Sequence, residues 1–346
     1  GKTVLRQADV ERSLRSMLPP QRAAELQACG GTCFSVTIGP EIRVRVNASQ
    51  THDGTKLAVR MLRAGPPTLE SLGFPRSVEQ ATSQPQGLVL VVGPAGHGKT
   101  TTLAALVDFV NQTRPVHIIV VEDPVEVPIP SKTAVVSQRE VGAHAQSFHR
   151  ALEGALRQDP DVVVVGELRD VETVRMALAA SETGHLVLAT MNAPNARRAI
   201  ERIIDVFPSA EQPQVRTTLA GGLRLVLGQR LVVRADGQGR AAALEILPGS
   251  GALWNLIRED KTLQLPSLMP RGKALGIVRL EDSIKRLRDD GTIDAETAQD
   301  LLEQADGASE LARVDVAAPA PEESAEESTL GNLWNRAGAL LSRKGS

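Results

Sequence analysis

The segment GPAGHGKT at residues 93–100 constrains the fold of this chain more than any other part of the sequence. It fits the pattern GxxxxGK[ST], follows an apolar run at 88–92 and precedes apolar residues at helical spacing between 103 and 110. A strand, a glycine-rich turn and a helix in this order form a loop whose inward N–H groups, with the helix N-terminus, bind phosphate. The alternative is a glycine-rich turn that fits the pattern by chance.

The residue types in this loop suit a nucleotide. Lys99 supplies a mobile cation for the phosphates, and the hydroxyl of Thr100 is a ligand for Mg²⁺. His97 is not needed to surround a phosphate, so we interpret it as a solvent-facing loop residue. The residues expected to contact the nucleotide are Gly93, Pro94, Ala95, Gly96, His97, Gly98, Lys99, Thr100 and Thr101.

Composition excludes several classes of protein. The 346 residues, 42% of them apolar, exceed one typical core, and no apolar run reaches the ~18 residues of a membrane span. Without a secretory leader, an intracellular multidomain protein is expected. A net charge of -2, 2% aromatic residues and no Tyr argue against a nucleic-acid groove. Cys29 and Cys33 match neither a zinc site nor a disulfide framework, so we expect both to be reduced.

Residues 1–63 are predicted to form a small α+β domain. Helical patterns at 10–18 and 21–28 precede strand-like alternation at 33–38, 42–47 and 56–62. Turn signals at 39–41 and 52–54 join the strands as a meander. The chain begins at Gly1 rather than at Met, so an incomplete N-terminus is one interpretation. Residues 64–86 are predicted to be a linker, with its clearest signal in AGPPTLESLGFP at 64–75.

Residues 87–265 are predicted to form an α/β domain. Apolar strands at 88–92, 116–121, 162–165 and 186–190 alternate with helical segments, which indicates a parallel sheet with helices on both faces. Ligands bind at the carboxyl ends of such strands. We therefore expect Gly93, Glu122, Glu167 and Met191 to surround one site.

The remainder is predicted to be helical and then disordered. Helices are expected at 253–259, 280–289 and 295–303, with Gly291 and Gly307 as stops and a helical region at 266–306. Residues 307–328 form an acidic linker whose segment DVAAPAPEESAEES cannot bury a core. An amphipathic helix is expected at 329–346, either docked on a partner or membrane surface or folded back on its own domain. Its apolar stripe consists of Leu330, Leu333, Trp334, Ala337, Leu340 and Leu341.

Carboxylates at two strand ends supply candidate catalytic groups. Glu122, Asp123 and Glu126 follow one strand, where an acid can hold Mg²⁺ or water. Glu167 follows the strand at 162–165, the position of a Walker B acid or a general base in P-loop enzymes, and we predict that it is the base. Each acid could instead form a salt bridge or lie at a helix N-terminus. Asp170 is expected to cap the helix at 171–180.

Several segments together resemble the secretion ATPase superfamily that powers type II secretion and type IV pili. The similarity spans about 40–300, with 93–100 as Walker A, 122–126 as the Asp box, 163–170 as Walker B and 183–192 as the His box. Within this superfamily ALWNLIRE at 252–259 is similar to the AIRNLIRE motif of retraction ATPases of the PilT type. The segments that carry the resemblance are GPAGHGKTTTLAALVDFVN, VVEDPVE, QREVG, ALRQDPDVVVVGELRDVETVRMALAASETGHLV, RIIDVFP and GQRL.

The resemblance implies a fold and a set of partners. It implies a RecA-like P-loop ATPase domain behind a PAS-like α+β domain, and a homohexamer that binds ATP and Mg²⁺ between the two lobes of each subunit. The implied partner is a pilus platform protein at the inner face of the cytoplasmic membrane, with no nucleic acid and with peripheral membrane association. The four-cysteine module of extension and secretion ATPases is not found in this sequence, which favours retraction.

The resemblance also assigns residues. Arg45 and Arg60 match arginines that could compensate charge on the γ-phosphate, although both could be surface arginines of a strand. His185, the first histidine of the His box, is a candidate catalytic residue, but the second histidine is replaced by Asn192, which cannot become charged. Three functions follow: a retraction motor for twitching motility, a nucleotide-binding accessory or regulatory paralogue, and a pilus-assembly or type II secretion ATPase.

Overall fold

The computed structural model describes residues 6–38, 42–62, 65–269, 272 and 275–314, with side chains described as far as residue 304. The chain divides into two compact units, Gly1–Leu301 and Leu302–Ser346. Three predicted features lie outside the described residues: the turn at 39–41, most of the acidic linker and the terminal helix at 329–346. Within the described part, no helix combines the length and the apolar character that a membrane crossing requires.

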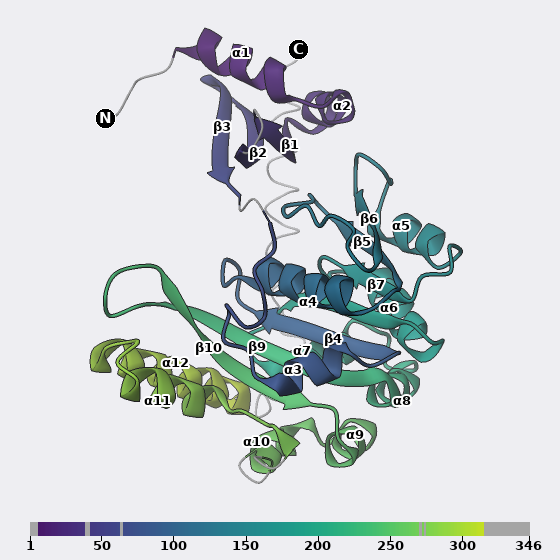
Figure 1. Cartoon of the computed structure of the whole chain (residues 1–346), viewed down its shortest axis with the longest axis vertical. Helices are drawn as coiled ribbons and strands as arrows, with labels where there is room; N and C mark the ends of the chain where they lie inside the picture. The colour runs from purple at the N-terminus through teal and green to yellow at the C-terminus, as the bar shows by residue number, and fades with distance from the viewer. Residues whose placement is uncertain (1–5, 39–41, 63–64, 270–271, 273–274, 315–346) are drawn as a thin grey trace, which may run out of the picture. The chain divides into compact units, whose positions relative to one another are not determined.

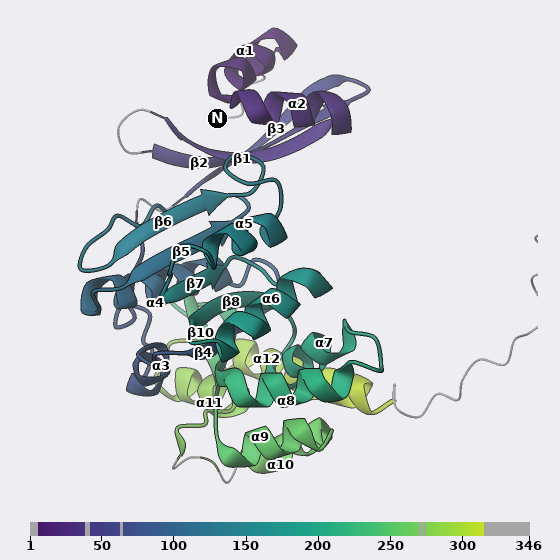
Figure 2. The ribbon, with the colours of Figure 1, turned by 90° about the vertical axis from the view of Figure 1, so that its right-hand side faces the viewer.

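The N-terminal region is a three-stranded antiparallel meander with two helices on one face (Figure 2), as the alternation of its residues predicts. Val44, Val46 and Ala48 point to the helices and form a small core with Leu14, Leu26 and Phe34. The intervening positions place Arg43 and Arg45 on the other face, because side chains alternate along a strand. The elements are α1 (Gln7–Met17), α2 (Pro20–Cys29), β1 (Gly31–Ile38), β2 (Ile42–Thr51) and β3 (Gly54–Met61).

The predicted linker contains ordered structure. Helix α3 (Arg76–Thr82) lies within it, and the segment before the helix contributes buried apolar side chains. Leu69, Phe74, Val78 and Ala81 pack in the same cluster as the apolar side of the helix that follows the phosphate-binding loop. This segment is therefore part of the core of the next domain.

A seven-stranded sheet forms the centre of the second domain (Figure 1), with strand order β10-β9-β4-β8-β7-β5-β6. All neighbours are parallel except β10, which is antiparallel to β9 and lies at the edge. The parallel sheet is confirmed, whereas β6, β9 and β10 were not predicted. The strands are β4 (Gly87–Gly93), β5 (His117–Glu122), β6 (Val135–Glu140), β7 (Val162–Val165), β8 (Leu186–Asn192), β9 (Leu223–Val233) and β10 (Arg240–Pro248).

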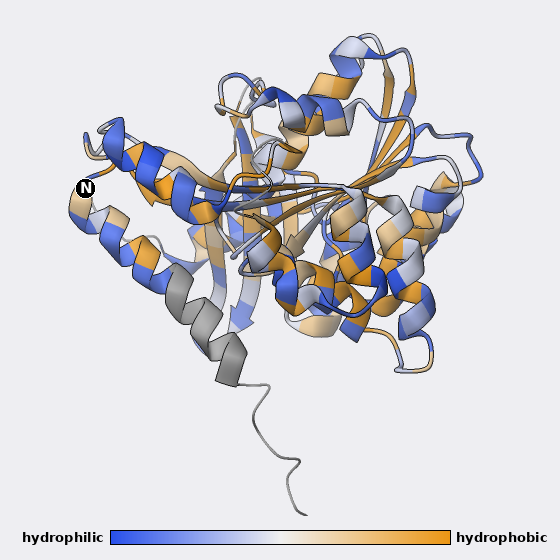
Figure 3. Cartoon of the chain, turned by 90° about the horizontal axis from the view of Figure 1, so that it is seen from below, coloured by the Kyte–Doolittle hydropathy of each residue, from blue (hydrophilic) through white to orange (hydrophobic). Residues whose placement is uncertain are grey.

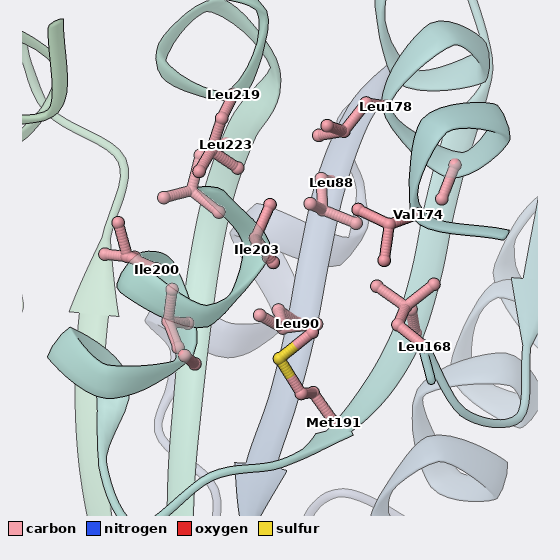
Figure 4. Packing of buried hydrophobic residues seen from close by; sticks show 14 of the residues in the cluster. Leu88, Leu90, Leu168, Val174, Leu178, Met191, Ile200, Ile203, Leu219 and Leu223 are labelled. Atoms are coloured by element: carbon pink, nitrogen blue, oxygen red, sulfur yellow. The ribbon is translucent and has the colours of Figure 1, made fainter. Parts of the chain in front are cut away.

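Helices cover both faces of this sheet, as predicted. Leu88 and Leu90 of β4 point to one face, where they pack with Val174, Ile203 and Leu219 from three helices (Figure 4). Val89 and Val91 point to the other face, where α3 and the helix after the loop pack. Figure 3 shows the apolar colour along the strands and the polar colour on the outer sides of the helices. These helices are α4 (Lys99–Thr113), α5 (Phe148–Ala155), α6 (Val171–Glu182), α7 (Ala196–Asp205), α8 (Gln212–Gly222) and α9 (Gly251–Arg258).

A helix near the end of the first unit packs against the edge strand of the sheet. Helix α10 (Leu265–Leu268) precedes α11 (Leu280–Asp289), whose Ser283 Oγ accepts a hydrogen bond from the Leu244 N–H of β10 at 3.0 Å. Gly291 ends the turn after α11 with φ 68°, as predicted. The prediction that Gly307 stops the next helix is wrong, because α12 (Ala295–Val314) continues through it. One interior glycine costs a helix only about 1 kcal/mol, and the neighbouring Ala and Leu residues favour helix.

Candidate nucleotide-binding site

Four parallel strands end around one cavity of about 440 Å³. The ends of β4, β5, β7 and β8 lie at the same edge of the sheet, so the loop after Gly93, Glu122, Glu167 and Asn192 come together. Met191, which we expected at the site, points into the core and is 2% exposed. The lining residues are Arg45, Arg60, Ala95, Gly96, Gly98, Lys99, Thr100, Thr101, Glu122, Asp123, Pro124, Glu126, Phe148, Gly166, Glu167, Arg169, Thr190, Asn192, Leu231 and Arg240.

The phosphate-binding loop lies close against β9, and two glycines allow this approach. Gly98 has φ 83° at the N-cap of α4, and a Cβ there would lie 3.1 Å from side-chain atoms of Gln229 and Leu231. A Cβ on Gly93 would lie 2.5 Å from the Gln229 carbonyl oxygen. Glycine at these positions therefore reflects both backbone conformation and lack of space.

The interpretation of His97 as a solvent-facing residue is wrong. Its Nδ1 accepts a hydrogen bond from the Leu231 N–H at 2.9 Å, and its carbonyl accepts one from Gln229 Nε2 at 2.5 Å. Gln229 Oε1 in turn accepts from the Thr102 hydroxyl at 2.7 Å. Burial lowers the pKa of His97, and the positive charges of Arg230, Lys99 and Arg240 lower it further, so the ring is neutral and Nδ1 can accept. This contact could not be predicted from local sequence patterns, because Gln229 is 132 residues away from His97.

Lys99 uses all three of its donors inside the protein. Its Nζ donates to the carbonyl oxygens of Gly93 at 2.9 Å and Pro94 at 2.8 Å, and to Asn192 Oδ1 at 2.5 Å. Burial lowers the pKa of Lys99, while the charge of Glu167 acts in the opposite direction. Three neutral oxygen acceptors thus hold the ammonium beside the loop.

Glu167 lies in the same cavity and is held from both sides. Its Oε1 accepts from Asn192 Nδ2 at 2.5 Å, and its Oε2 accepts from Arg169 Nε at 2.7 Å. Donors to both oxygens fix the orientation of this carboxyl group, which a general base requires. Asp170, three residues after Glu167, accepts from the Thr173 N–H at 2.8 Å and caps α6, as predicted.

The Asp box contributes a second group of acids. Burial, together with the charges of Glu126 and Glu140, raises the pKa of Glu122 to about 8, so this side chain is largely protonated at neutral pH. Asp123 accepts from Arg22 Nη2 at 3.3 Å. A cation placed near Glu122 would favour its ionised form, which makes this carboxyl sensitive to what the cavity holds.

Two arginines of the N-terminal domain face the same cavity. Arg45 and Arg60 are paired across β2 and β3 and both line it. Arg45 Nη1 donates to Glu126 Oε1 at 2.7 Å and Arg45 Nε donates to Cys33 Sγ at 3.1 Å. Within the described part of the chain, Arg60 has no hydrogen-bond or ion-pair partner. The cavity is therefore lined by two guanidinium groups. That of Arg45 is hydrogen-bonded to Glu126 and Cys33, and that of Arg60 is free to bind a ligand.

His185 does not reach the cavity. It precedes the first residue of β8, and its Nδ1 lies 3.1 Å from the Ala180 carbonyl oxygen. The seven residues of β8 span roughly 20 Å at about 3.3 Å per residue, so His185 is at the opposite edge of the sheet from Asn192. This position does not support a catalytic role for His185 in the nucleotide-binding cavity of the same chain.

Sequence reasoning missed several lining residues. Arg169 could have been found, because it follows Glu167 by two positions in the same strand-end loop. Leu231 and Arg240 could not, because they come from strands that were not predicted. Phe148 begins α5 and likewise carries no local signal.

A glycine-rich loop at the carboxyl edge of a parallel sheet, with the loop lysine and a strand-end glutamate in one cavity, defines a P-loop NTPase with a RecA-like domain. The type II/IV secretion system protein family matches residues 22–274, and the chain belongs to this family.

Individual relatives agree with this assignment. The chain is 43% identical to the Type IV pilus retractation ATPase PilT of Pseudomonas aeruginosa, over 78% of each chain. It is also 43% identical to the uncharacterized protein YggR of Escherichia coli, over 82% of this chain and 87% of YggR. A crystal structure of the pilus retraction motor PilT with bound ADP matches with a TM-score of 0.77 and 39% identity, over 84% of this chain and 83% of that one.

Proposed function

We propose that this protein is an ATP-hydrolysing motor that powers type IV pilus retraction. The observation that carries the proposal is the common cavity in which Lys99 and Glu167 are joined through Asn192. Similarity to a retraction ATPase over most of both chains supports retraction rather than extension of the pilus.

The residues present fit a nucleotide and Mg²⁺. The loop from Gly93 to Thr101 supplies backbone N–H groups and the start of α4, and Lys99 exchanges Asn192 Oδ1 for a phosphate oxygen. Thr100 would hold the metal directly, with Glu122 and Asp123 acting through water, and Mg²⁺ would neutralise phosphate charge. Glu167 removes a proton from water as it attacks the γ-phosphorus, and the products are ADP and phosphate.

The N-terminal domain supplies the charge compensation in this proposal. Arg60 is available to the γ-phosphate, and Arg45 must first exchange Glu126 for a phosphate oxygen. A guanidinium stabilises the charge that accumulates on the transferring group. Nucleotide would therefore draw the N-terminal domain toward the loop.

The proposed working form is a homohexameric ring at the cytoplasmic face of the inner membrane. There it acts on a platform protein of the pilus, and closure of each cleft supplies the movement. Cells that lack the protein should accumulate pili, whereas bald cells would instead favour a pilus-assembly ATPase. Sizing the purified protein with ATP tests the ring, and a strictly monomeric species would contradict it.

The second candidate is a nucleotide-binding accessory subunit that hydrolyses little or no ATP. Asn192 favours it, because this residue replaces the second His-box histidine and ties the proposed base to the loop lysine.

Phosphate release by the purified protein separates the two candidates. Glu167→Gln should lower the rate by at least about 100-fold, because positioned base catalysis contributes ~10²–10⁴-fold, while ADP affinity stays close to that of the unchanged protein. The matched control is Glu182→Gln, the same change at an exposed position of α6, which should leave the rate unchanged. Equal rates of phosphate release by the unchanged protein and its Glu167→Gln variant would contradict the proposal that the protein is an ATP-hydrolysing motor.

A further inference from the structure

Asn192 occupies the point at which the loop and the Walker B strand meet. It is the last residue of β8 and lies opposite Gly93, the last residue of β4, in the register of the sheet. Its Oδ1 accepts from Lys99 at 2.5 Å and its Nδ2 donates to Glu167 at 2.5 Å. Its backbone carbonyl accepts from Arg202 Nη1 at 2.9 Å, which holds the strand end in place from α7.

Chemistry fixes the orientation of this amide. The ammonium of Lys99 has only donors, and the carboxylate of Glu167 has only acceptors. The amide must therefore present its oxygen to Lys99 and its nitrogen to Glu167, and no flipped arrangement satisfies both. One neutral side chain thus sets the separation between the cation that holds phosphate and the group proposed as the base.

Lys99 cannot bind phosphate while all three of its bonds remain. Two of its acceptors are carbonyl oxygens of the loop itself, and Asn192 is the one that belongs to a side chain. Exchange of Asn192 Oδ1 for a phosphate oxygen releases Lys99 and leaves Nδ2 bonded to Glu167. The base then keeps its orientation when the lysine moves.

We propose that Asn192 is a positioning residue for hydrolysis, which holds Glu167 in place and gives up Lys99 when nucleotide binds. This inference rests on the proposed function. The charged groups around the amide are Lys99 from α4, Glu167 and Arg169 from the loop after β7, and Arg202 from α7.

An amide makes this bridge independent of pH near neutrality. A neutral histidine could accept from Lys99 with one nitrogen and donate to Glu167 with the other. Once protonated it would have no acceptor left for Lys99 and would add a positive charge beside it. The identity of residue 192 therefore determines whether the bridge responds to pH.

Steady-state ATP hydrolysis from pH 5.5 to 8.5 tests the inference. Asn192→Ala should lower kcat by about 10- to 100-fold at every pH, because a misplaced catalytic group costs up to about 100-fold, with KM changed less than 3-fold. Asn192→His should approach the unchanged protein above pH 7.5 and lose activity below about pH 6.5, the usual pKa of histidine. Melting temperature and ADP affinity are recorded for each variant.

The matched control is Asn195→Ala, three residues further on, where the side chain caps α7 by accepting from the Arg198 N–H at 2.9 Å. It should lower the melting temperature and leave the pH profile and kcat unchanged. An Asn192→Ala kcat within 2-fold of the unchanged protein, or an Asn192→His profile parallel to it, would overturn the inference. If Glu167→Gln is inactive in the same assay, the proposed function survives that result. Absence of hydrolysis in the unchanged protein would overturn both.

Discussion

His97 connects the phosphate-binding loop to a strand that is distant in the sequence. Its Nδ1 accepts from the Leu231 N–H, and its carbonyl accepts from Gln229. The lowered pKa of His97 keeps Nδ1 unprotonated and able to accept at neutral pH. Because the folded pKa lies below that of the unfolded chain, the bond stabilises the fold above about pH 6.5 and is lost as pH falls through the folded value.

We predict that His97→Ser lowers the free energy of unfolding at pH 7.5 by about 1 kcal/mol, the usual net contribution of one hydrogen bond. The difference from the unchanged protein should be smaller at pH 5, because protonation removes the acceptor as pH falls through the lowered folded pKa of His97. Urea denaturation at the two pH values measures it. His52→Ser, the same change at an exposed turn residue, should have no effect at either pH. If His97→Ser lowered the free energy of unfolding equally at both pH values, the stabilising contribution of His97 would not come from its Nδ1 hydrogen bond.

At the scale of elements, β10 fixes the start of α7. Glu245 of β10 is 8% exposed, and its Oε2 accepts from the Ala196 N–H at the first residue of that helix at 2.7 Å. The pKa of Glu245 is raised to about 7, chiefly by burial, with the bond from Ala196 acting to lower it and the charge of Glu281 acting to raise it. The folded state therefore keeps a proton between about pH 4.5 and pH 7 that the unfolded chain releases. Stability from this group is full below that range and falls as pH rises through it.

We predict that Glu245→Gln stabilises the protein at pH 8 relative to pH 5. Glutamine keeps an oxygen for Ala196 but carries no charge, so it avoids the cost of a buried carboxylate. The advantage over the unchanged protein should grow by on the order of 2–3 kcal/mol across this range, at 1.36 kcal/mol per pKa unit. Chemical denaturation at both pH values measures it, with Glu70→Gln at an exposed position as control. A difference in stability between Glu245→Gln and the unchanged protein that did not vary with pH would contradict this prediction, because Glu245 would then not titrate between pH 5 and pH 8.

The elements differ in how far their sequences predict them. Apolar runs such as Leu88–Val92 and Val162–Val165 end at glycines and are too short for helices, so they read directly as buried parallel strands. Strand β10 could not be read in this way, because its residues RAAALEIL favour helix in isolation and are extended only because β9 pairs with them. Lys99 and Glu167 follow predictable strands and were found, whereas Arg240 and the partner of His97 depend on β9 and β10.

At the scale of the whole molecule, the N-terminal domain has a core of its own and meets the ATPase domain through polar contacts. Its apolar cluster contains only residues of the first 57 positions. Arg43 Nη2 donates to the Val125 carbonyl oxygen at 2.7 Å, and Ser35 Oγ donates to the same oxygen at 2.6 Å. A polar contact of this kind permits the two domains to move relative to each other, as the proposed binding of a nucleotide between them requires.

Arg22 is the most buried member of this contact. Its guanidinium side chain is 6% exposed and donates to Glu25 of its own domain at 2.9 Å, to Asp123 and Glu140, and to the Val141 carbonyl oxygen at 2.6 Å. Truncation leaves three carboxylates without this cation, and because Glu25 and Asp123 are partly exposed, the loss of stability is smaller than for a fully buried ion pair.

We predict that Arg22→Ala destabilises the contact while the N-terminal core stays folded. Amide hydrogen exchange should accelerate at residues 123–127 and 140–145 and remain slow in β1 and β2, because their core does not depend on Arg22. Raising the salt concentration should produce a weaker version of the same pattern in the unchanged protein, since ion pairs are screened. The control is Arg12→Ala on α1, where the side chain is 80% exposed and its loss should change nothing. Uniformly faster exchange through β1 and β2 would instead mean that Arg22 stabilises its own domain, and the contact with the Asp box would then not be what holds the two domains together.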